Sequence, residues 1–281
     1  MIKNILKGIV IGLANIIPGV SGGTMAVSMG IYDKLIHCVT HLFKEFKKSV
    51  LFLIPIFLGA GIAVVGLTFV IPTMFARFPL QTNLLFIGLI VGGLPAVWKK
   101  VKGQSVRAGH ILAFLIFFAL VAGMAAFGES EGKAADLSFG VLNVIKLFGV
   151  GVIASATMII PGVSGSMILL LLGYYNPVIG AIKDFITALA AFDMPGILTG
   201  VGILMPFGFG VVFGIFAIAK IIEVIFVKFP LYAYWAIIGL IAASPIAILL
   251  AGELGTITVI AVLTGAAALA VGVIIAMKLG E

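Results

Sequence analysis

Six long apolar runs constrain the fold of this 281-residue chain more than any other feature. An α-helix needs about 20 apolar residues to cross the hydrocarbon core of a bilayer. The runs cover residues 50–75, 81–98, 110–127, 199–222, 231–251 and 256–277. Hydrophobic residues make up 63% of the chain and charged residues 10%, whereas soluble domains are about half apolar and about a quarter charged. The sequence therefore predicts an all-α polytopic membrane protein, and it excludes a soluble enzyme or a nucleic-acid-binding protein.

Two other apolar stretches are each interrupted by the same helix-breaking motif. Residues 16–23 read IIPGVSGG, and residues 159–166 read IIPGVSGS. Proline removes a backbone donor and glycine weakens a helix, so neither stretch can continue as one regular helix. A broken backbone at membrane depth is tolerated only where protein buries it or where it lines a cavity. We therefore expect two re-entrant helical hairpins, over residues 5–43 and 142–175.

The basic residues favour hairpins that return to the side from which they enter. With a cytoplasmic N-terminus and re-entrant hairpins, 13 of the 17 Lys and Arg residues lie in cytoplasmic segments, as the positive-inside rule requires. If the hairpins crossed the membrane, the basic segment 34–48 would lie on the side opposite Lys3 and Lys7, and the bias would weaken. The sequence therefore predicts that both termini are cytoplasmic.

The chain also contains an internal repeat. An offset of 143 residues relates the two motifs, and an offset of 151 relates Arg77-Phe-Pro-Leu to Lys228-Phe-Pro-Leu. The predicted organisation is a first repeat over 1–127, an acidic extracytoplasmic linker over 128–141 and a second repeat over 142–281. Each repeat holds one hairpin and three spans, so the odd number of crossings inverts the second repeat. Inverted repeats with paired interrupted segments are typical of alternating-access transporters; the alternative is a helical bundle that grew by duplication.

The chemistry of the two hairpin tips favours an anion. Serine is a preferred helix N-cap, and the free amides at a helix start carry partial positive charge. Glycine lets a ligand approach the backbone closely, and such helix starts bind phosphate and carboxylate groups. The candidate binding residues are Ser21, Gly22, Gly23, Thr24, Ser164, Gly165 and Ser166. Arg77 and Lys228 end equivalent spans and either guide an anion to the tips or extend to the membrane surface as ordinary interfacial side chains.

These motifs resemble a known family. Asn15 followed by IIPGVSGGTMA (16–26) and GIYDKLI (30–36), together with NLLFIGLIVGGLP (83–95) and MIIPGVSGSMILLLLGYY (158–175), is similar to the PopT family of polyprenyl-phosphate transporters. The resemblance implies a prokaryotic plasma-membrane protein that returns undecaprenyl phosphate from the outer to the inner leaflet, with the phosphate held by the two PGVSG tips. It also implies an acidic residue at position 15. Asn15 is a further candidate binding residue, but it departs from that pattern, so the coupling ion, for which a proton is one candidate, stays open.

Other polar groups receive simpler interpretations. His37, Cys38 and His41 suggest a metal site, but the sequence offers no third ligand and Lys44 and its neighbours repel cations. We therefore expect an amphipathic interfacial helix over 34–48 and no metal. Lys220 and Glu223 are expected to form an interfacial i,i+3 pair, the alternatives being a buried ion pair or a proton relay.

The predicted function is transport. No nucleophile lies beside a base in the sequence, and the chain has no Walker A motif, so we expect neither catalysis nor a cofactor. The expected partners are a lipid phosphate as substrate and the surrounding membrane lipids, with no nucleic acid. The alternative function is a channel or exchanger for small inorganic anions. Homo-oligomerisation is left open.

Overall fold

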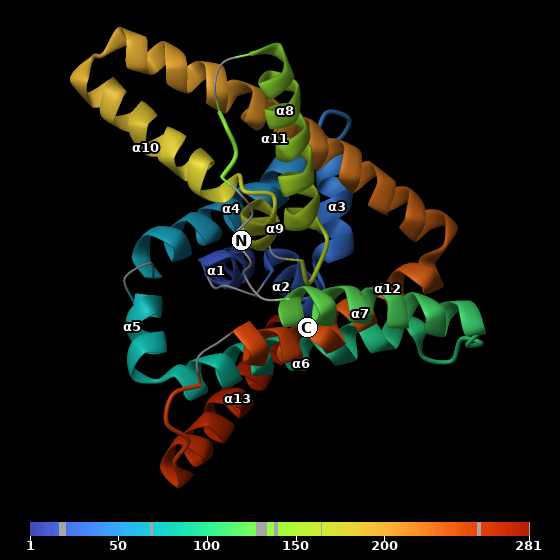
Figure 1. Cartoon of the computed structure of the whole chain (residues 1–281). Coiled ribbons are helices and arrows are strands. Elements are labelled where there is room, and N and C mark those ends of the chain that lie inside the picture. The colour runs from blue at the N-terminus through green and yellow to red at the C-terminus, as the bar shows by residue number, and fades with distance from the viewer. Residues whose placement is uncertain are drawn as a thin grey trace. The chain divides into compact units, whose positions relative to one another are not determined.

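The computed structural model describes residues 1–16, 21–67, 70–127, 134–137, 140–163, 165–251 and 254–280. Every regular element in these ranges is an α-helix (Figure 1). The chain forms two compact units. The first contains Met1–Gly128, Ile160–Val163 and Lys220–Glu281, and the second contains Glu129–Ile159 and Ser164–Ala219.

Thirteen helices make up the described part of the chain, and most of them belong to the first unit. The helices of the first unit are α1 (Ile2–Ile16), α2 (Gly22–Ser28), α3 (Tyr32–Thr40), α4 (Phe46–Leu67), α5 (Val70–Arg77), α6 (Pro79–Val101), α7 (Ala108–Phe127), α12 (Pro230–Ala251) and α13 (Val259–Gly280). The helices of the second unit are α8 (Val141–Ile159), α9 (Gly165–Leu171) and α10 (Tyr175–Ala191). Helix α11 (Met194–Lys228) contributes residues to both units.

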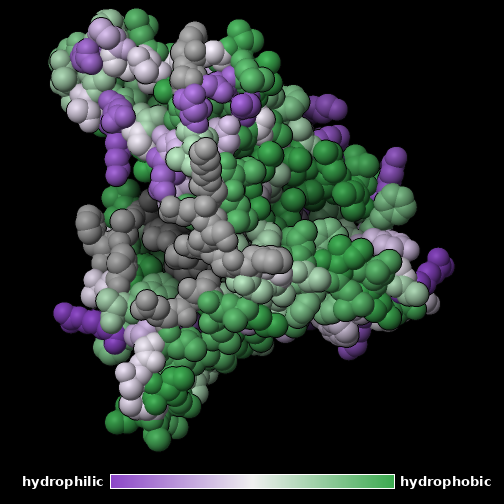
Figure 2. All heavy atoms as spheres, viewed as in Figure 1, coloured by the Kyte–Doolittle hydropathy of each residue, from purple (hydrophilic) through white to green (hydrophobic). Residues whose placement is uncertain are grey.

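Seven of the described helices are long and apolar enough to cross a membrane. Six of them overlap the six apolar runs, and the seventh is α8, the first arm of the second expected hairpin. Many large hydrophobic side chains are exposed, including Leu51 and Phe57 on α4 and Leu263 on α13. Hydrophobic residues cover most of the face shown in Figure 2. Such a surface is stable in lipid and not in water, so the predicted class, an all-α polytopic membrane protein, is confirmed.

Helices break at both PGVSG motifs. Helix α1 ends at Ile16 and α2 begins at Gly22, while α8 ends at Ile159 and α9 begins at Gly165. Gly162 has a φ of +79°, a conformation that is costly for residues with a Cβ. After the second motif, α9 and α10 are bent by 105° at a short break. The Pro161-Gly162 pair thus lies between two helices, as the sequence predicts, whereas Pro18 and Gly19 of the first motif lie outside the described part of the chain. The return of either hairpin to its own side of a membrane stays a prediction.

The single helix expected over 34–48 is wrong. Helix α3 ends at Thr40, a turn follows, and α4 begins at Phe46. The Thr40 Oγ1 lies 3.1 Å from the backbone carbonyl oxygens of both Ile36 and His37. Beyond Thr40 the backbone bonds change to the tighter i→i−3 pattern of a turn, from the Leu42 N–H to Val39 O at 3.3 Å and from the Lys44 N–H to His41 O at 3.0 Å, so the α-helix does not continue.

Equivalent positions of the two sequence halves pack in equivalent ways. A Cβ at Gly59 of α4 would collide with the backbone carbonyl of Ile5 on α1, and a Cβ at Gly210 of α11 would collide with that of Phe148 on α8. The sequence offsets of 143 and 151 relate exactly these pairs, since Ile5 matches Phe148 and Gly59 matches Gly210. Small residues let helix backbones approach closely in membranes. The matched contacts support the repeat, and its inversion stays a prediction.

In the first unit, helices from the first half of the sequence pack against helices from the second half. Helix α6 packs against α13, and α12 packs against α7. The close approaches occur at Gly88, where a Cβ would meet the backbone of Leu269, and at the equivalent Gly239, where it would meet the backbone of Phe114. The sequence predicts each of these spans but not this pairing.

Candidate functional site

The first tip is buried at the start of α2. Ser21 is the N-cap residue with extended backbone angles, and its side chain makes no capping hydrogen bond. All residues of α2 are buried, and Thr24 is only 1% exposed. Two glycines, Gly22 and Gly23, leave the first two positions of this helix without side chains. The predicted residues Ser21 to Thr24 therefore lie together, inside the first unit.

The two motifs meet within that unit. The backbone N–H of Gly162 donates a hydrogen bond to the Oγ1 of Thr24, with 2.7 Å between nitrogen and oxygen. Gly162 belongs to the Pro-Gly pair of the second motif and lies 138 residues after Thr24 in the chain. The Thr24 hydroxyl accepts this bond and keeps its own proton for another acceptor. A polar contact therefore joins the first tip to the backbone of the second motif.

The surroundings of this contact are apolar. A Cβ at Gly162 would lie 3.2 Å from the Leu240 Cβ and 3.3 Å from a methyl group of Val121. These two side chains belong to a buried cluster with Ala243 and Ala247. A hydrogen bond in an apolar setting is electrostatically stronger than one in water, and losing either partner is correspondingly costly.

The remaining predicted tip residues are described only in part. Gly165 and Ser166 begin α9 in the second unit, where a Cβ at Gly165 would lie 2.8 Å from Thr157 Oγ1. Ser166 is exposed. Ser164 and the side chain of Asn15 lie outside the described part of the chain.

Arg77 and Lys228 end matching helices. Arg77 is the last residue of α5 and Lys228 is the last residue of α11, and both side chains are exposed. After each residue a Phe donates its backbone N–H to the preceding turn, from Phe78 to Met74 O at 2.8 Å and from Phe229 to Ile225 O at 2.7 Å. A proline then begins the next helix.

Lys228 lines a surface pocket of about 420 Å³ in the first unit. Arg107 and His110 share this pocket, together with the polar side chains of Gln104 and Ser105. His110 is buried, and its Nδ1 accepts a hydrogen bond from the backbone N–H of Arg107 at 3.1 Å. The pocket thus brings two basic side chains together, and sequence reasoning counted Arg107 only as part of the overall charge.

Polar contacts hold the far end of α2. Lys7 is 7% exposed, and its ammonium donates to the carbonyl of Met29 at 2.9 Å, where α2 ends. A cation at a helix C-terminus is favourable. Next along the chain, Asp33 accepts a hydrogen bond from the Tyr234 hydroxyl at 2.9 Å and lies 3.6 Å from the Lys100 ammonium. The sequence analysis did not predict this structural role of Lys7. Its position inside an apolar stretch could have indicated it, because a buried lysine needs a polar partner.

Two groups near α3 have altered acidity. Burial raises the pKa of Tyr32, and the neighbouring charge of Asp33 raises it further. Burial also raises the pKa of the Cys38 thiol. Both groups are therefore neutral at physiological pH, which makes Cys38 a poor metal ligand or nucleophile.

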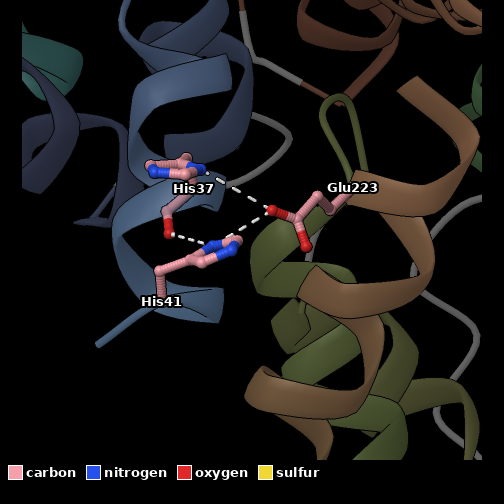
Figure 3. A group of neighbouring side chains, drawn as sticks. All are labelled: His37, His41 and Glu223. Carbon is pink, nitrogen blue, oxygen red and sulfur yellow. Dashed lines mark hydrogen bonds and ion pairs between the residues drawn. The ribbon is translucent and has the colours of Figure 1, made fainter. Parts of the chain in front are cut away.

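The structure supplies the third group that the sequence did not offer beside the histidines. Glu223 Oε1 lies 3.7 Å from His37 Nδ1 and 3.2 Å from His41 Nδ1 (Figure 3). The expected i,i+3 pair is confirmed, because the Lys220 ammonium lies 2.6 Å from Glu223 Oε2.

Comparisons with known proteins agree with these features. The family model described as undecaprenyl phosphate translocase-like matches residues 11–251. A polyprenyl-phosphate transporter of Staphylococcus aureus is 30% identical over 248 residues, which are 87% of this chain and 85% of that protein. A polyprenyl-phosphate transporter of Vibrio cholerae is 34% identical over 209 residues, which are 69% of this chain and 65% of that protein. No solved structure matches. The chain therefore belongs to the undecaprenyl phosphate translocase-like family of multi-pass membrane proteins.

Proposed function

We propose that this protein carries a polyprenyl phosphate, such as undecaprenyl phosphate, from the outer to the inner leaflet of a bacterial plasma membrane. Family membership supports the substrate class. The observation that carries the proposed site is the hydrogen bond between Gly162 and Thr24, because it joins hydroxyl and amide groups of both motifs in an apolar part of the first unit.

Phosphate chemistry suits the groups at the first tip. The Ser21 hydroxyl makes no capping bond, and the Thr24 hydroxyl still has a proton to donate while its oxygen accepts from Gly162. The amides at the start of α2 add partial positive charge. In the proposed bound state, these donors hold the phosphate oxygens and the isoprenoid tail stays among lipids. We propose Ser164, Gly165 and Ser166 as further phosphate ligands on the sequence argument alone.

The basic pocket offers a first contact for the headgroup. Lys228 and Arg107 line it together, and two cations attract a phosphate more strongly than one exposed lysine. We propose that they concentrate the lipid headgroup at the membrane surface before it reaches the tips. Arg77 is proposed to serve the equivalent end of the first half.

The proposed cycle is alternating access without catalysis. Rocking of one repeat against the other exposes the phosphate site first to one face and then to the other. A lipid gradient, the proton motive force or the membrane potential supplies direction, and the potential contributes about 2.3 kcal/mol per elementary charge at 100 mV. Both termini are proposed to be cytoplasmic.

The decisive experiment measures flipping of a labelled polyprenyl phosphate in proteoliposomes. The variants are the wild type, the double substitution Ser21→Ala/Ser164→Ala, and Thr187→Val as a control. The exposed Thr187 hydroxyl donates to the Lys183 carbonyl of its own helix, α10. Flipping by the wild type and the control, with loss in the double variant, is the expected result. Flipping no faster than in protein-free vesicles, with gradients of either sign, would exclude lipid transport. Release of trapped inorganic phosphate instead would favour the small-anion pathway.

A further inference from the structure

Three potential metal-ligating side chains gather at the end of α3. His37 and His41 are four residues apart, so they lie on the same face of the helix end, and their rings stack with centroids 4.2 Å apart. Glu223 approaches from α11, and both histidines turn Nδ1 toward its Oε1 (Figure 3). All three residues belong to the first unit. One ligand atom from each lies within 4.8 Å of the other two.

We propose that His37, His41 and Glu223 bind one divalent transition-metal ion, of which Zn²⁺ is the best match. Two imidazoles and one carboxylate are an established zinc ligand set, with a fourth position left for water. The same set disfavours Mg²⁺ and Ca²⁺, which prefer ligand shells made of oxygen. This site is separate from the proposed phosphate site and does not depend on it.

The distances are compatible with small side-chain movements. Tetrahedral zinc with bonds of about 2.0–2.2 Å brings neighbouring ligand atoms to roughly 3.3 Å from each other. His41 Nδ1 and Glu223 Oε1 already lie 3.2 Å apart, while His37 Nδ1 lies 3.7 Å from the same oxygen, and all three ligand atoms lie within 4.8 Å of one another. The main adjustment therefore falls on His37. The His37 side chain is 50% exposed and has room to turn, whereas Glu223 is 15% exposed and fixed.

Two neighbours orient the carboxylate. The Thr40 hydroxyl has one proton, which it can donate to Glu223 Oε1 at 3.0 Å in place of the carbonyls of its own helix. The Lys220 ammonium donates to Oε2. Partners of this kind fix the orientation of metal-binding carboxylates. Lys220 adds a positive charge that opposes a cation, but its side chain is 60% exposed, so solvent screens it and it can move away.

Metal binding would fasten two parts of the first unit to each other. The histidines stand at the end of α3, which follows α2 after a short turn, and Glu223 stands in the last turns of α11. An ion shared by these residues replaces contacts among one exposed and two partly buried side chains with bonds to one centre. We therefore expect the metal to stabilise the folded protein.

The test uses purified full-length protein without a polyhistidine tag, titrated with Zn²⁺ against a chromophoric chelator. We expect one competitive site per chain, with Ni²⁺ displacing Zn²⁺ and Mg²⁺ failing to do so. His41→Gln and Glu223→Gln should each weaken binding by at least about tenfold, since even outer partners of a metal are worth that much. The matched control is Glu45→Gln, which removes a carboxylate from the turn between α3 and α4 whose ion-pair partner among the described residues is Lys48.

Thermal unfolding gives a second readout. A ligand that binds only the folded state raises its apparent stability, so Zn²⁺ should raise the Tm of the wild type and of Glu45→Gln, and a chelator should reverse the shift. His37→Gln, at a half-exposed side chain, keeps the test valid if other variants fold poorly. Equal zinc affinity in the wild type and His37→Gln/His41→Gln would overturn the proposal, as would the absence of a stoichiometric site. If Glu223→Gln bound Zn²⁺ as tightly as the wild type, Glu223 would not be a ligand, and the proposed metal link between α3 and α11 would be wrong.

Discussion

The Oγ1 of Thr24 accepts a hydrogen bond of 2.7 Å from the backbone N–H of Gly162, 138 residues further along the chain, and so joins the segments of the two repeated motifs. The contact is not symmetric, because the residue that matches Thr24 at the offset of 143 is Met167, which has no hydroxyl group. The first motif therefore contributes a side chain and the second contributes backbone. Several consequences of this arrangement and of the surrounding packing can be measured.

Replacing Thr24 should lower the free energy of unfolding, because its hydroxyl accepts the hydrogen bond from Gly162. Thr24→Val keeps the shape of the side chain but leaves the Gly162 N–H without its acceptor, which costs about 1–3 kcal/mol for a buried donor. Thr24→Ser keeps the hydroxyl and should recover most of the loss. Denaturant unfolding in detergent measures both effects. Thr187→Val, at an exposed hydroxyl, should change stability little, and equal losses at positions 24 and 187 would contradict the assignment.

Gly162 should not tolerate a side chain. Its φ of +79° is strained for L-residues, and a Cβ would press on Leu240 and Val121. We expect Gly162→Ala to lower the free energy of unfolding by about 1–3 kcal/mol. In contrast, Gly180→Ala on α10 places its methyl group in open space and should be neutral or stabilising by up to about 1 kcal/mol. Comparing the Tm of the two variants checks this, and a harmless Gly162→Ala would argue against the described backbone.

The matched glycines of the repeat should behave alike. Gly59→Ala and Gly210→Ala each force a methyl group against a neighbouring backbone, and overpacking of this kind costs about 1–3 kcal/mol. Gly61→Ala, on the same helix as Gly59 but facing open space, is the control. Yields of folded protein and thermal unfolding report the difference. If position 61 proved as sensitive as position 59, the proposed packing of α1 on α4 would fail.

The basic pocket should matter most at low ionic strength. Lys228→Gln/Arg107→Gln removes two charges from one pocket, so headgroup capture should slow by about tenfold or more at low salt, because such attraction is an electrostatic effect on rate. The difference should shrink as salt screens the charges. Lys47→Gln removes an exposed charge elsewhere and serves as the control in the same flipping assay. A salt-independent loss would point to a structural defect instead.

The sequence alone determined the membrane class, the apolar helices and the places where helices break. These features follow from local composition, because lipid requires long apolar helices and Pro-Gly pairs interrupt them wherever they occur. The helix ends at Arg77 and Lys228 were likewise visible in the repeated Phe-Pro pair. The family resemblance rested on the same local motifs.

Only the tertiary structure decided which distant groups meet. Thr24 contacts Gly162, and Glu223 contacts His37 and His41 across about two thirds of the chain. Helix α6 packs mainly against α13, far along the chain, and less against its neighbour α5. Hydrophobic periodicity does not encode such pairings, since every apolar helix satisfies lipid equally well. The packing of glycine surfaces and the need to pair buried polar groups select among them.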